Sequence, residues 1–447
     1  MQGTFRPDVL FGLDPMWTST ILLVAVYMVI ITERVNRAVI ALLGAGLMIQ
    51  FGVLDQAEAV KGIDFDTIAL LTGMMILVAV SWRSGMFQYL AIWSAKAARA
   101  EPWRVLLLLS IVTAVLSALL NNVTVVLLVA PVTLSITQQL EVPPYPFLFA
   151  EVFASNVGGT ATLIGDPPNI LIGTQAGLSF DQFVVHLAPA IVLVMAVQAV
   201  VTHLVWGKTM RATAEAEARV MAMDERHAIQ DRTLLVQSLL VMGAVMLAFI
   251  FAESLHLEDG TIAMFGAAVL MLLDTHGHHP TKQSEKVTQM FNEIEWVTIF
   301  FFVGLFILVH GVEVSGLLQR LAEILAQATH GNLELAAYVT LWMSAVLSAV
   351  IDNIPFVATM IPLVKSAAPA YGGLDHIQPM WWALSLGACL GGNGTLIGAS
   401  ANLTMAGLAE RNGIPFSFIR YTAYAFPMML LSIAVCQLYV WLRYFYF

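Results

Sequence analysis

The sequence predicts an all-α, polytopic membrane protein built from two inverted-topology repeats. Of the 447 residues, 59% are hydrophobic and only 11% are charged, whereas about 25% are charged in typical soluble domains. The mean hydropathy is +0.81, and apolar runs of membrane-spanning length follow one another along nearly the whole chain. The same order of elements then appears again in the second half. No stretch is left for a soluble domain, and the net charge of −10 does not favour nucleic acid as a partner.

Apolar runs in the first half predict five spans, the fourth of them broken. Residues 83–101 carry charges among apolar residues, which is typical of an amphipathic helix at the membrane interface. Residues 104–138 form two apolar limbs that meet at Asn121, Asn122 and Thr124, where a single span would reach mid-membrane. We therefore expect a re-entrant hairpin there. The spans are expected at residues 17–33, 37–53, 66–82, 146–180 and 184–206.

The second half repeats this order after a polar segment. Residues 208–232 mix charges of both signs, which predicts a solvated linker. An amphipathic stretch is expected at 313–330 and a second hairpin at 335–368. The spans of this half are expected at residues 233–253, 260–275, 295–312, 380–409 and 420–442.

A constant offset relates the two halves. Gly73 recurs as Gly304 and Asn122 as Asn353, each 231 positions later. Five spans plus a hairpin that returns to its own side make the halves inverted relative to each other. The predicted units are a first repeat at 1–207, with scaffold helices at 17–53 and transport elements at 66–206, and a second repeat at 233–447, with scaffold helices at 233–275 and transport elements at 295–442.

The basic residues predict the orientation. If the linker is cytoplasmic, 15 of the 20 lysines and arginines lie inside, as the positive-inside rule requires. Both termini then lie outside, and the predicted location is the inner (plasma) membrane. The five basic residues left on the outer side are Arg6, Lys61, Arg320, Lys365 and Arg443.

Two broken helices are predicted at corresponding places. Residues 155–169 read SNVGGTATLIGDPPN, in which Pro167 and Pro168 each remove a backbone donor and the glycines loosen the chain. A weaker copy, GGNGTLIGASAN, occupies residues 391–402. In lipid, such breaks are tolerated only where protein or a watery cavity surrounds them, so paired breaks indicate a transport site.

Four elements should converge at this site: the two hairpin tips and the two breaks. They offer amides, hydroxyls and helix ends that can bind a small polar solute or an ion. The expected substrate-binding residues are Asn121, Asn122, Thr124, Asn156, Gly158, Gly159, Thr160, Thr162, Asn353, Gly391, Gly392, Asn393 and Thr395. The residues expected to shape the loops are Pro167, Pro168, Asn169, Ser400 and Asn402.

Each half has one carboxylate that its copy lacks. Asp352 aligns with Asn121, and Asp166 aligns with Ala399. A carboxylate inside the bilayer is costly and by default functional, so both are expected to couple transport to an ion or a proton. For Asp166 the alternative is a helix N-cap in front of Pro167. None of the four elements contains Lys or Arg, which favours a neutral, hydroxylated solute over a multivalent organic anion.

The sequence offers little support for a thiolate, metal or nucleotide site. Cys389 and Cys436 are too few for a three-thiolate site, and Cys389 is interpreted as a small packing residue. His276, His278 and His279 are interpreted as a solvated loop and not as a metal site. The phosphate-binding pattern GxxxxGK[ST] is absent, so energy must come from an ion gradient or from a separate ATPase partner. We expect neither an enzyme nor a cofactor.

The loop GGTATLIGDPPN at residues 158–169 resembles the signature of the arsenite permease and P-protein branch of the ion transporter superfamily. Sodium-coupled carboxylate carriers and NhaD-type sodium/proton antiporters are related to it. The resemblance implies that solute and coupling ions bind between hairpin tips and loops, and that a homodimer works as an elevator. The expected function is export of arsenite and antimonite in exchange for protons; the alternatives are an NhaD-type antiporter and a sodium-coupled di- or tricarboxylate carrier.

Overall fold

The computed structural model describes residues 7–32 and 34–446, and all regular secondary structure in them is helical. Arg6 and the last position of the first predicted span lie outside the described residues. Within these ranges, eight helices are long and apolar enough to cross a membrane. They are α4 (Phe65–Trp82), α6 (Pro102–Leu119), α7 (Asn122–Leu140), α10 (Phe180–Thr202), α12 (Arg232–Ile250), α16 (Trp296–Val314), α19 (Asn353–Ala367) and α22 (Phe418–Trp441), where α10, α19 and α22 continue as further helical turns to Gly207, Tyr371 and Tyr446.

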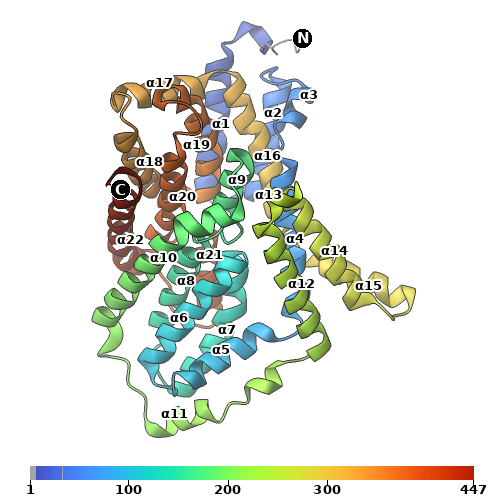
Figure 1. The fold of residues 1–447 in the computed structure, drawn as a ribbon, viewed down its shortest axis with the longest axis vertical. Coiled ribbons are helices and arrows are strands. Elements are labelled where there is room, and N and C mark those ends of the chain that lie inside the picture. The colour runs from blue at the N-terminus through green and yellow to red at the C-terminus, as the bar shows by residue number, and fades with distance from the viewer. Residues whose placement is uncertain (1–6, 33, 447) are drawn as a thin grey trace.

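The remaining predicted elements are also helices, and the fold class predicted from the sequence is confirmed (Figure 1). Three shorter apolar helices are α1 (Pro15–Ile31), α2 (Arg37–Gln50) and α18 (Leu333–Ser348). The amphipathic stretches are α5 (Met86–Ala97) and α17 (Leu317–Ala328), and α14 (Asp259–Thr275) follows α12. The broken spans are α8 (Tyr145–Gly159) with α9 (Pro167–Ala176), and α20 (Gln378–Gly391) with α21 (Ser400–Arg411).

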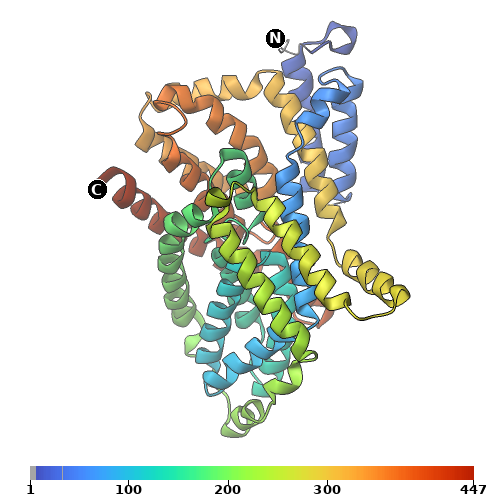
Figure 2. The same ribbon diagram turned by 45° about the vertical axis from the view of Figure 1, so that its right-hand side comes forward.

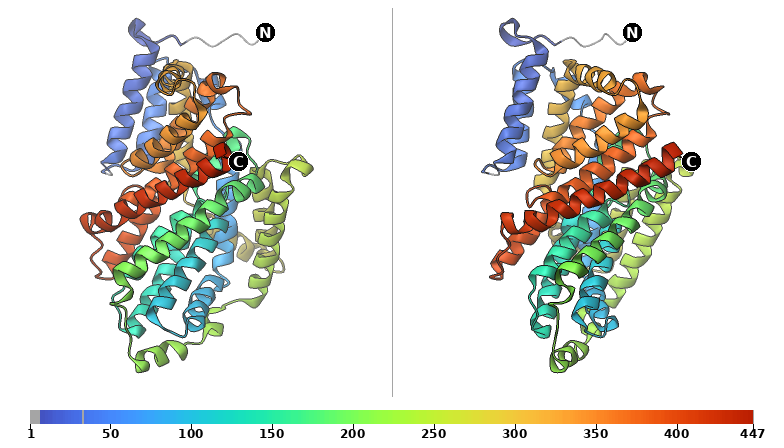
Figure 3. Two further views of the ribbon diagram at one scale, coloured as in Figure 1. Left: turned by 60° about the vertical axis from the view of Figure 1, so that its left-hand side comes forward. Right: turned by 90° about the vertical axis from the view of Figure 1, so that its left-hand side faces the viewer.

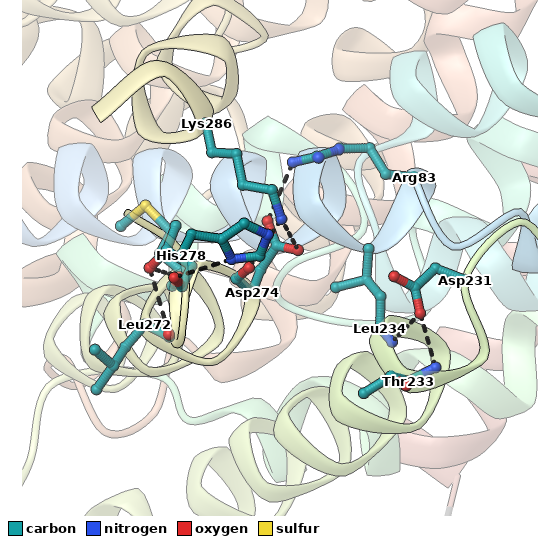
Figure 4. A network of polar contacts seen from close by, with 10 residues as sticks. Arg83, Asp231, Thr233, Leu234, Leu272, Asp274, His278 and Lys286 are labelled. Atoms are coloured by element: carbon teal, nitrogen blue, oxygen red, sulfur yellow. Dashed lines mark hydrogen bonds and ion pairs between the residues drawn. The ribbon is translucent and has the colours of Figure 1, made fainter. Parts of the chain in front are cut away.

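Several short polar helices have no counterpart in the prediction. They are α3 (Gln56–Lys61), α11 (Ala214–Met221) inside the linker, α13 (Ala252–Leu255) and α15 (Pro280–Asn292). Hydropathy does not find such helices because they bury little; α15 buries only Met290. Its position is instead fixed by charge. Figure 4 shows Asp274 of α14 bound by Arg83 Nη1 at 3.2 Å and by Lys286 Nζ of α15 at 3.1 Å.

Two three-helix groups combine helices from both repeats. One contains α1, α2 and α16, and the other contains α12, α14 and α4. Glycine permits the close approach in each group. A Cβ on Gly73 of α4 would lie 2.6 Å from the backbone carbon of Ala263, and a Cβ on Gly304 of α16 would lie 2.6 Å from that of Ala41. The repeated glycines therefore mark helix contacts that depend on small residues.

The hairpins and broken helices pack against one another around the centre of the molecule. The α6–α7 hairpin packs on α8, and the α18–α19 hairpin packs on α20. The second halves of the broken spans then cross over, because α9 packs on α19 and α21 packs on α7. In Figures 2 and 3 the first hairpin enters from the end that carries the linker and the second from the opposite end, while α10 and α22 run side by side.

Candidate functional site

Two asparagines hold the non-helical segments of the broken spans. The Asn169 amide donates to the backbone oxygens of Thr160 and Thr162, at 3.1 and 2.9 Å. The Asn402 amide donates to those of Gly392 and Thr395, at 2.8 and 2.9 Å. These carbonyls would otherwise be unpaired at the end of a helix, which is costly in an apolar region. Asn169 and Asn402 therefore brace the two breaks in the same way.

The hairpins are attached to the breaks by equivalent serines. Ser117 Oγ donates to the backbone oxygen of Ser155 at 2.6 Å, and Ser348 Oγ donates to that of Ala388 at 2.6 Å. A second pair of contacts comes from hydroxyls in the breaks. Thr162 donates to the backbone oxygen of Ala118, and Thr395 to that of Ala349.

Glycines let the hairpins approach the broken helices. A Cβ on Gly158 would lie 2.2 Å from the backbone oxygen of Ala114, and a Cβ on Gly391 would lie 2.5 Å from that of Ala345. Gly159 and Gly392 similarly face the backbone across their own breaks. No other residue type fits at these contacts without moving the backbone. These four glycines shape the site and have no side chain to offer a solute.

An asparagine cluster joins the repeats at the centre. Asn122 Nδ2 donates to Asn156 Oδ1 at 3.1 Å and to Asp166 Oδ1 at 3.2 Å. Asn156 Nδ2 in turn donates to Asn393 Oδ1 and to Asn402 Oδ1, both at 2.9 Å. All five side chains are buried. The structure therefore brings together one hairpin tip and both breaks, as expected.

Cys389 takes part in the same network. It aligns with Asn156, and its thiol donates to Asn169 Oδ1 at 3.4 Å, just as Asn156 donates to Asn402. Ser385 Oγ also donates to Asn169 Oδ1, at 2.6 Å. Ser385 lies one helical turn before Cys389 on α20, so their spacing places both on one face. Interpreting Cys389 as packing alone was therefore incomplete, and Ser385 was missed.

Asp166 is the carboxylate at the centre of the site. It is 1% exposed, and its second oxygen, Oδ2, has no hydrogen-bond partner in the described part of the chain. The side chains of Cys389, Asn353 and Asn122 are its polar neighbours. Its side chain makes no capping hydrogen bond to α9: Pro167 and Pro168 have no N–H groups, and the N–H of Asn169 donates to the backbone oxygen of Asp166. The helix-cap interpretation of Asp166 is therefore wrong.

Asp352 has a different environment. Its Oδ1 caps α19 by accepting from the backbone N–H of Ile354 at 3.2 Å, and its Oδ2 lies 3.1 Å from Arg37 Nη1. Arg37 also donates to Ser400 Oγ at 2.8 Å and to Thr298 Oγ1 at 3.0 Å. The side chains of Arg37 and Asp352 are 25% and 17% exposed. A cavity of about 340 Å³ lies beside this pair.

Arg37 is the candidate site residue that the sequence analysis missed. It starts α2 and is 315 positions from Asp352, so no local spacing connects them. In the sequence analysis, Arg37 was counted only as one of the basic residues that place the linker side of the protein inside the cell. The four converging elements do lack Lys and Arg, but this guanidinium reaches the second hairpin tip from outside them.

The other expected residues lie around the cluster, and Asn353 is the one among them that neighbours Asp166. Asn121 caps α7 by accepting from the backbone N–H of Val123 at 2.9 Å. Thr160 Oγ1 donates to the backbone oxygen of Asn156 at 2.8 Å, and Asn353 is buried at the start of α19. Thr124 is half-buried in the first turn of α7 and makes no hydrogen bond with the cluster.

Comparisons with known proteins agree with this architecture. Residues 27–387 match the family model described as citrate transporter. The chain is 44% identical over 426 residues to an uncharacterized transporter of Mycobacterium tuberculosis, covering 94% of this chain and 97% of that one. It is 34% identical over 506 residues to the P protein of Homo sapiens, covering 94% of this chain and 59% of the P protein.

A solved structure has the same fold. It is the YdaH transporter of Alcanivorax borkumensis, with a TM-score of 0.58, 16% identity, and coverage of 96% of this chain and 98% of that one. The P-protein match supports the expected superfamily, whereas specificity for arsenite stays a prediction. The chain belongs to the citrate transporter family and is a multi-pass membrane transporter, not an enzyme.

Proposed function

We propose that this transporter exports a small, uncharged, hydroxylated solute in exchange for protons, with arsenous acid and its antimony analogue as the substrates. The asparagine cluster supports this proposal because it offers amide donors and acceptors but no cation. The guanidinium that reaches the second hairpin tip, that of Arg37, is engaged by Asp352, Ser400 and Thr298. A multivalent anion would face the Asp166 carboxylate without a free positive charge.

The observation that carries the proposal is the unpaired carboxylate oxygen of Asp166. A buried carboxylate with one bare oxygen is costly when ionised, so it favours taking up a proton or a cation. Its other oxygen accepts from Asn122, which links it directly to Asn156. We assign the proton to Asp166, so that protonation changes the hydrogen bonding of the solute-binding amides.

The solute would be held by the amides that now pair with one another. Asn122, Asn156 and Asn393 each combine a donor and an acceptor, and a hydroxylated solute can replace their mutual hydrogen bonds without leaving a buried group unpaired. Cys389 lies beside them and is the single thiol of the cluster. One thiol can interact with trivalent arsenic without trapping it, which suits a carrier that must release its cargo.

The second carboxylate, Asp352, contributes to coupling through its ion pair with Arg37. Arg37 belongs to the group of α1, α2 and α16, whereas Asp352 and Ser400 belong to the hairpin and the broken helix. We propose that this ion pair fixes one position of the hairpin block against the scaffold and is broken when the block moves as an elevator. A homodimer in the inner membrane with the linker in the cytoplasm completes the proposal.

Flux measurements in proteoliposomes test the proposal. Purified protein is reconstituted, and uptake of arsenite, sodium and citrate is compared under an imposed pH gradient with and without sodium. Arsenite flux that follows the pH gradient is expected. Sodium flux that follows the pH gradient without arsenite would instead establish an antiporter.

A carboxylate carrier is the second candidate function. The description of the matched family and the position of Arg37 near the polar cavity favour it. In that case citrate uptake would follow the sodium gradient and arsenite would not be transported.

A further inference from the structure

A large apolar groove lies apart from the asparagine cluster, between the first hairpin and α12. Its volume is about 960 Å³, at the upper end of the roughly 300–1,000 Å³ of small-molecule sites. One wall comes from α5 and α6 and the other from α12, which Figure 2 shows crossing in front of them. Residues that represent the two walls are Leu90, Leu116 and Leu119 on one side and Leu235, Leu239 and Met242 on the other.

Two arginines stand at one end of the groove. Arg226 and Arg232 line it from the short linker helix and from the start of α12. Both are exposed, and neither guanidinium has a carboxylate or hydrogen-bond partner among residues 7–32 and 34–446. Arg232 is the first residue of a helix long enough to cross a membrane, so it lies at one end of a span. Lipid headgroups lie at that level.

The neighbouring acids are already engaged. Glu225 pairs with Lys96, and Asp224 pairs with His227. Asp231 accepts from the backbone N–H groups at the start of α12, as Figure 4 shows for Thr233 and Leu234. None of these carboxylates contacts the guanidinium of Arg226 or Arg232, so both guanidiniums stay free to bind a phosphate.

We propose that this groove binds an anionic phospholipid. The phosphate lies between Arg226 and Arg232, and an acyl chain runs along the apolar walls toward the first hairpin tip. Basic pockets beside membrane spans bind anionic headgroups by this combination of charge and apolar contact. The groove reaches Leu119 and Leu120, which directly precede Asn121, so the bound chain contacts the tip of the first hairpin. This binding site is independent of which solute the protein transports.

Native mass spectrometry of the purified full-length protein tests the headgroup. Binding of palmitoyl-oleoyl phosphatidylglycerol is compared with that of the matching phosphatidylcholine. The double variant Arg226→Gln/Arg232→Gln should bind phosphatidylglycerol about thirtyfold more weakly, from about fivefold per basic residue. The control Lys208→Gln/Arg211→Gln removes the same charge from the same linker outside the groove. Equal binding of both lipids by the unaltered protein, or of phosphatidylglycerol by both double variants, overturns the proposal.

A second variant tests the acyl chain. Gly243 of α12 lines the groove and a Cβ on it would have no neighbour within 4 Å, so Gly243→Phe is chosen to place a ring in the groove. It should weaken phosphatidylglycerol binding at least tenfold, whereas Gly46→Phe, also in open space on α2, should not. Unchanged binding in Gly243→Phe overturns the proposal. So does binding of glycerol 3-phosphate as tight as that of the whole lipid, because the groove would then contribute nothing.

Discussion

The two halves of the site share one backbone frame and differ in their chemistry. Asn169 and Asn402 each brace their break through two backbone oxygens, of which those of Thr162 and Thr395 are equivalent, and Ser117 and Ser348 attach the two hairpins at the same 2.6 Å. The frame therefore meets a requirement common to both halves, which is to satisfy backbone groups freed inside an apolar region. The comparison teaches that function must be sought where the copies diverge.

They diverge most at their carboxylates. Asp166 is 1% exposed with an unpaired oxygen, whereas the Asp352 side chain is 17% exposed and pairs with Arg37. The position of Asp166 is Ala399 in the other half, and that of Asp352 is Asn121. The first break thus contributes a buried carboxylate, Asp166, that can take up a proton. The second hairpin tip contributes Asp352, whose ion pair with Arg37 can form and break.

The largest effect on stability is expected from substitutions of the glycines that the two halves share. Gly158→Val and Gly391→Val each place side-chain atoms onto the backbone of the facing hairpin, so both should destabilise the fold by more than about 3 kcal/mol. Size-exclusion chromatography and thermal melting in detergent measure this. Gly407→Ala, at a helical glycine with open space around it, should melt like the unaltered protein. If only one of the two valine variants folds normally, the backbone contacts of Gly158 and Gly391 are not equivalent in the two halves.

A large loss of function without loss of fold is expected from Asp166→Asn. The variant keeps the size and the Asn122 contact but removes the group assigned to the proton, so gradient-driven arsenite flux should fall to the level of empty vesicles. Its melting temperature should not fall, because a buried carboxylate with an unpaired oxygen is removed. Asp352→Asn should reduce proton-coupled flux less severely. Equal losses in both variants would remove the distinction between the carboxylates.

A smaller effect is expected from the asparagines. Asn156→Ala and Asn393→Ala should each weaken solute binding by about 1–3 kcal/mol, because the remaining buried amides lose partners. Cys389→Ala should weaken it much less, since its hydrogen bond to Asn169 is long and Ser385 also serves that oxygen. Calorimetric titration with arsenite measures all three. A Cys389 variant that alone abolishes binding would show that the thiol, not the amides, holds the solute.

The smallest effect is expected from the ion pair. Arg37→Gln, Asp352→Asn and the double variant form a cycle whose coupling energy should be about 0.5–1 kcal/mol, because both side chains are partly exposed. Thermal melting of the four proteins measures it. A coupling energy near zero would mean that the pair does not hold the hairpin block in this position.

Much of this fold could be predicted because hydropathy and duplication are properties of the sequence itself. The breaks, the hairpin tips and their convergence followed from prolines, polar tips and the repeat. Arg37 could not be predicted, because its contact with Asp352 depends on how α2 packs against α16. The short helix α15 was missed because it buries only Met290 and is held by an ion pair instead.

The central claim is that Asp166 carries the coupled proton, and simultaneous recording of arsenite flux and internal pH in proteoliposomes tests it most directly. In vesicles with the unaltered protein, arsenite movement should be accompanied by proton movement in the opposite direction. With Asp166→Asn, an imposed arsenite gradient should produce no change of internal pH. A pH change equal to that of the unaltered protein would contradict the account.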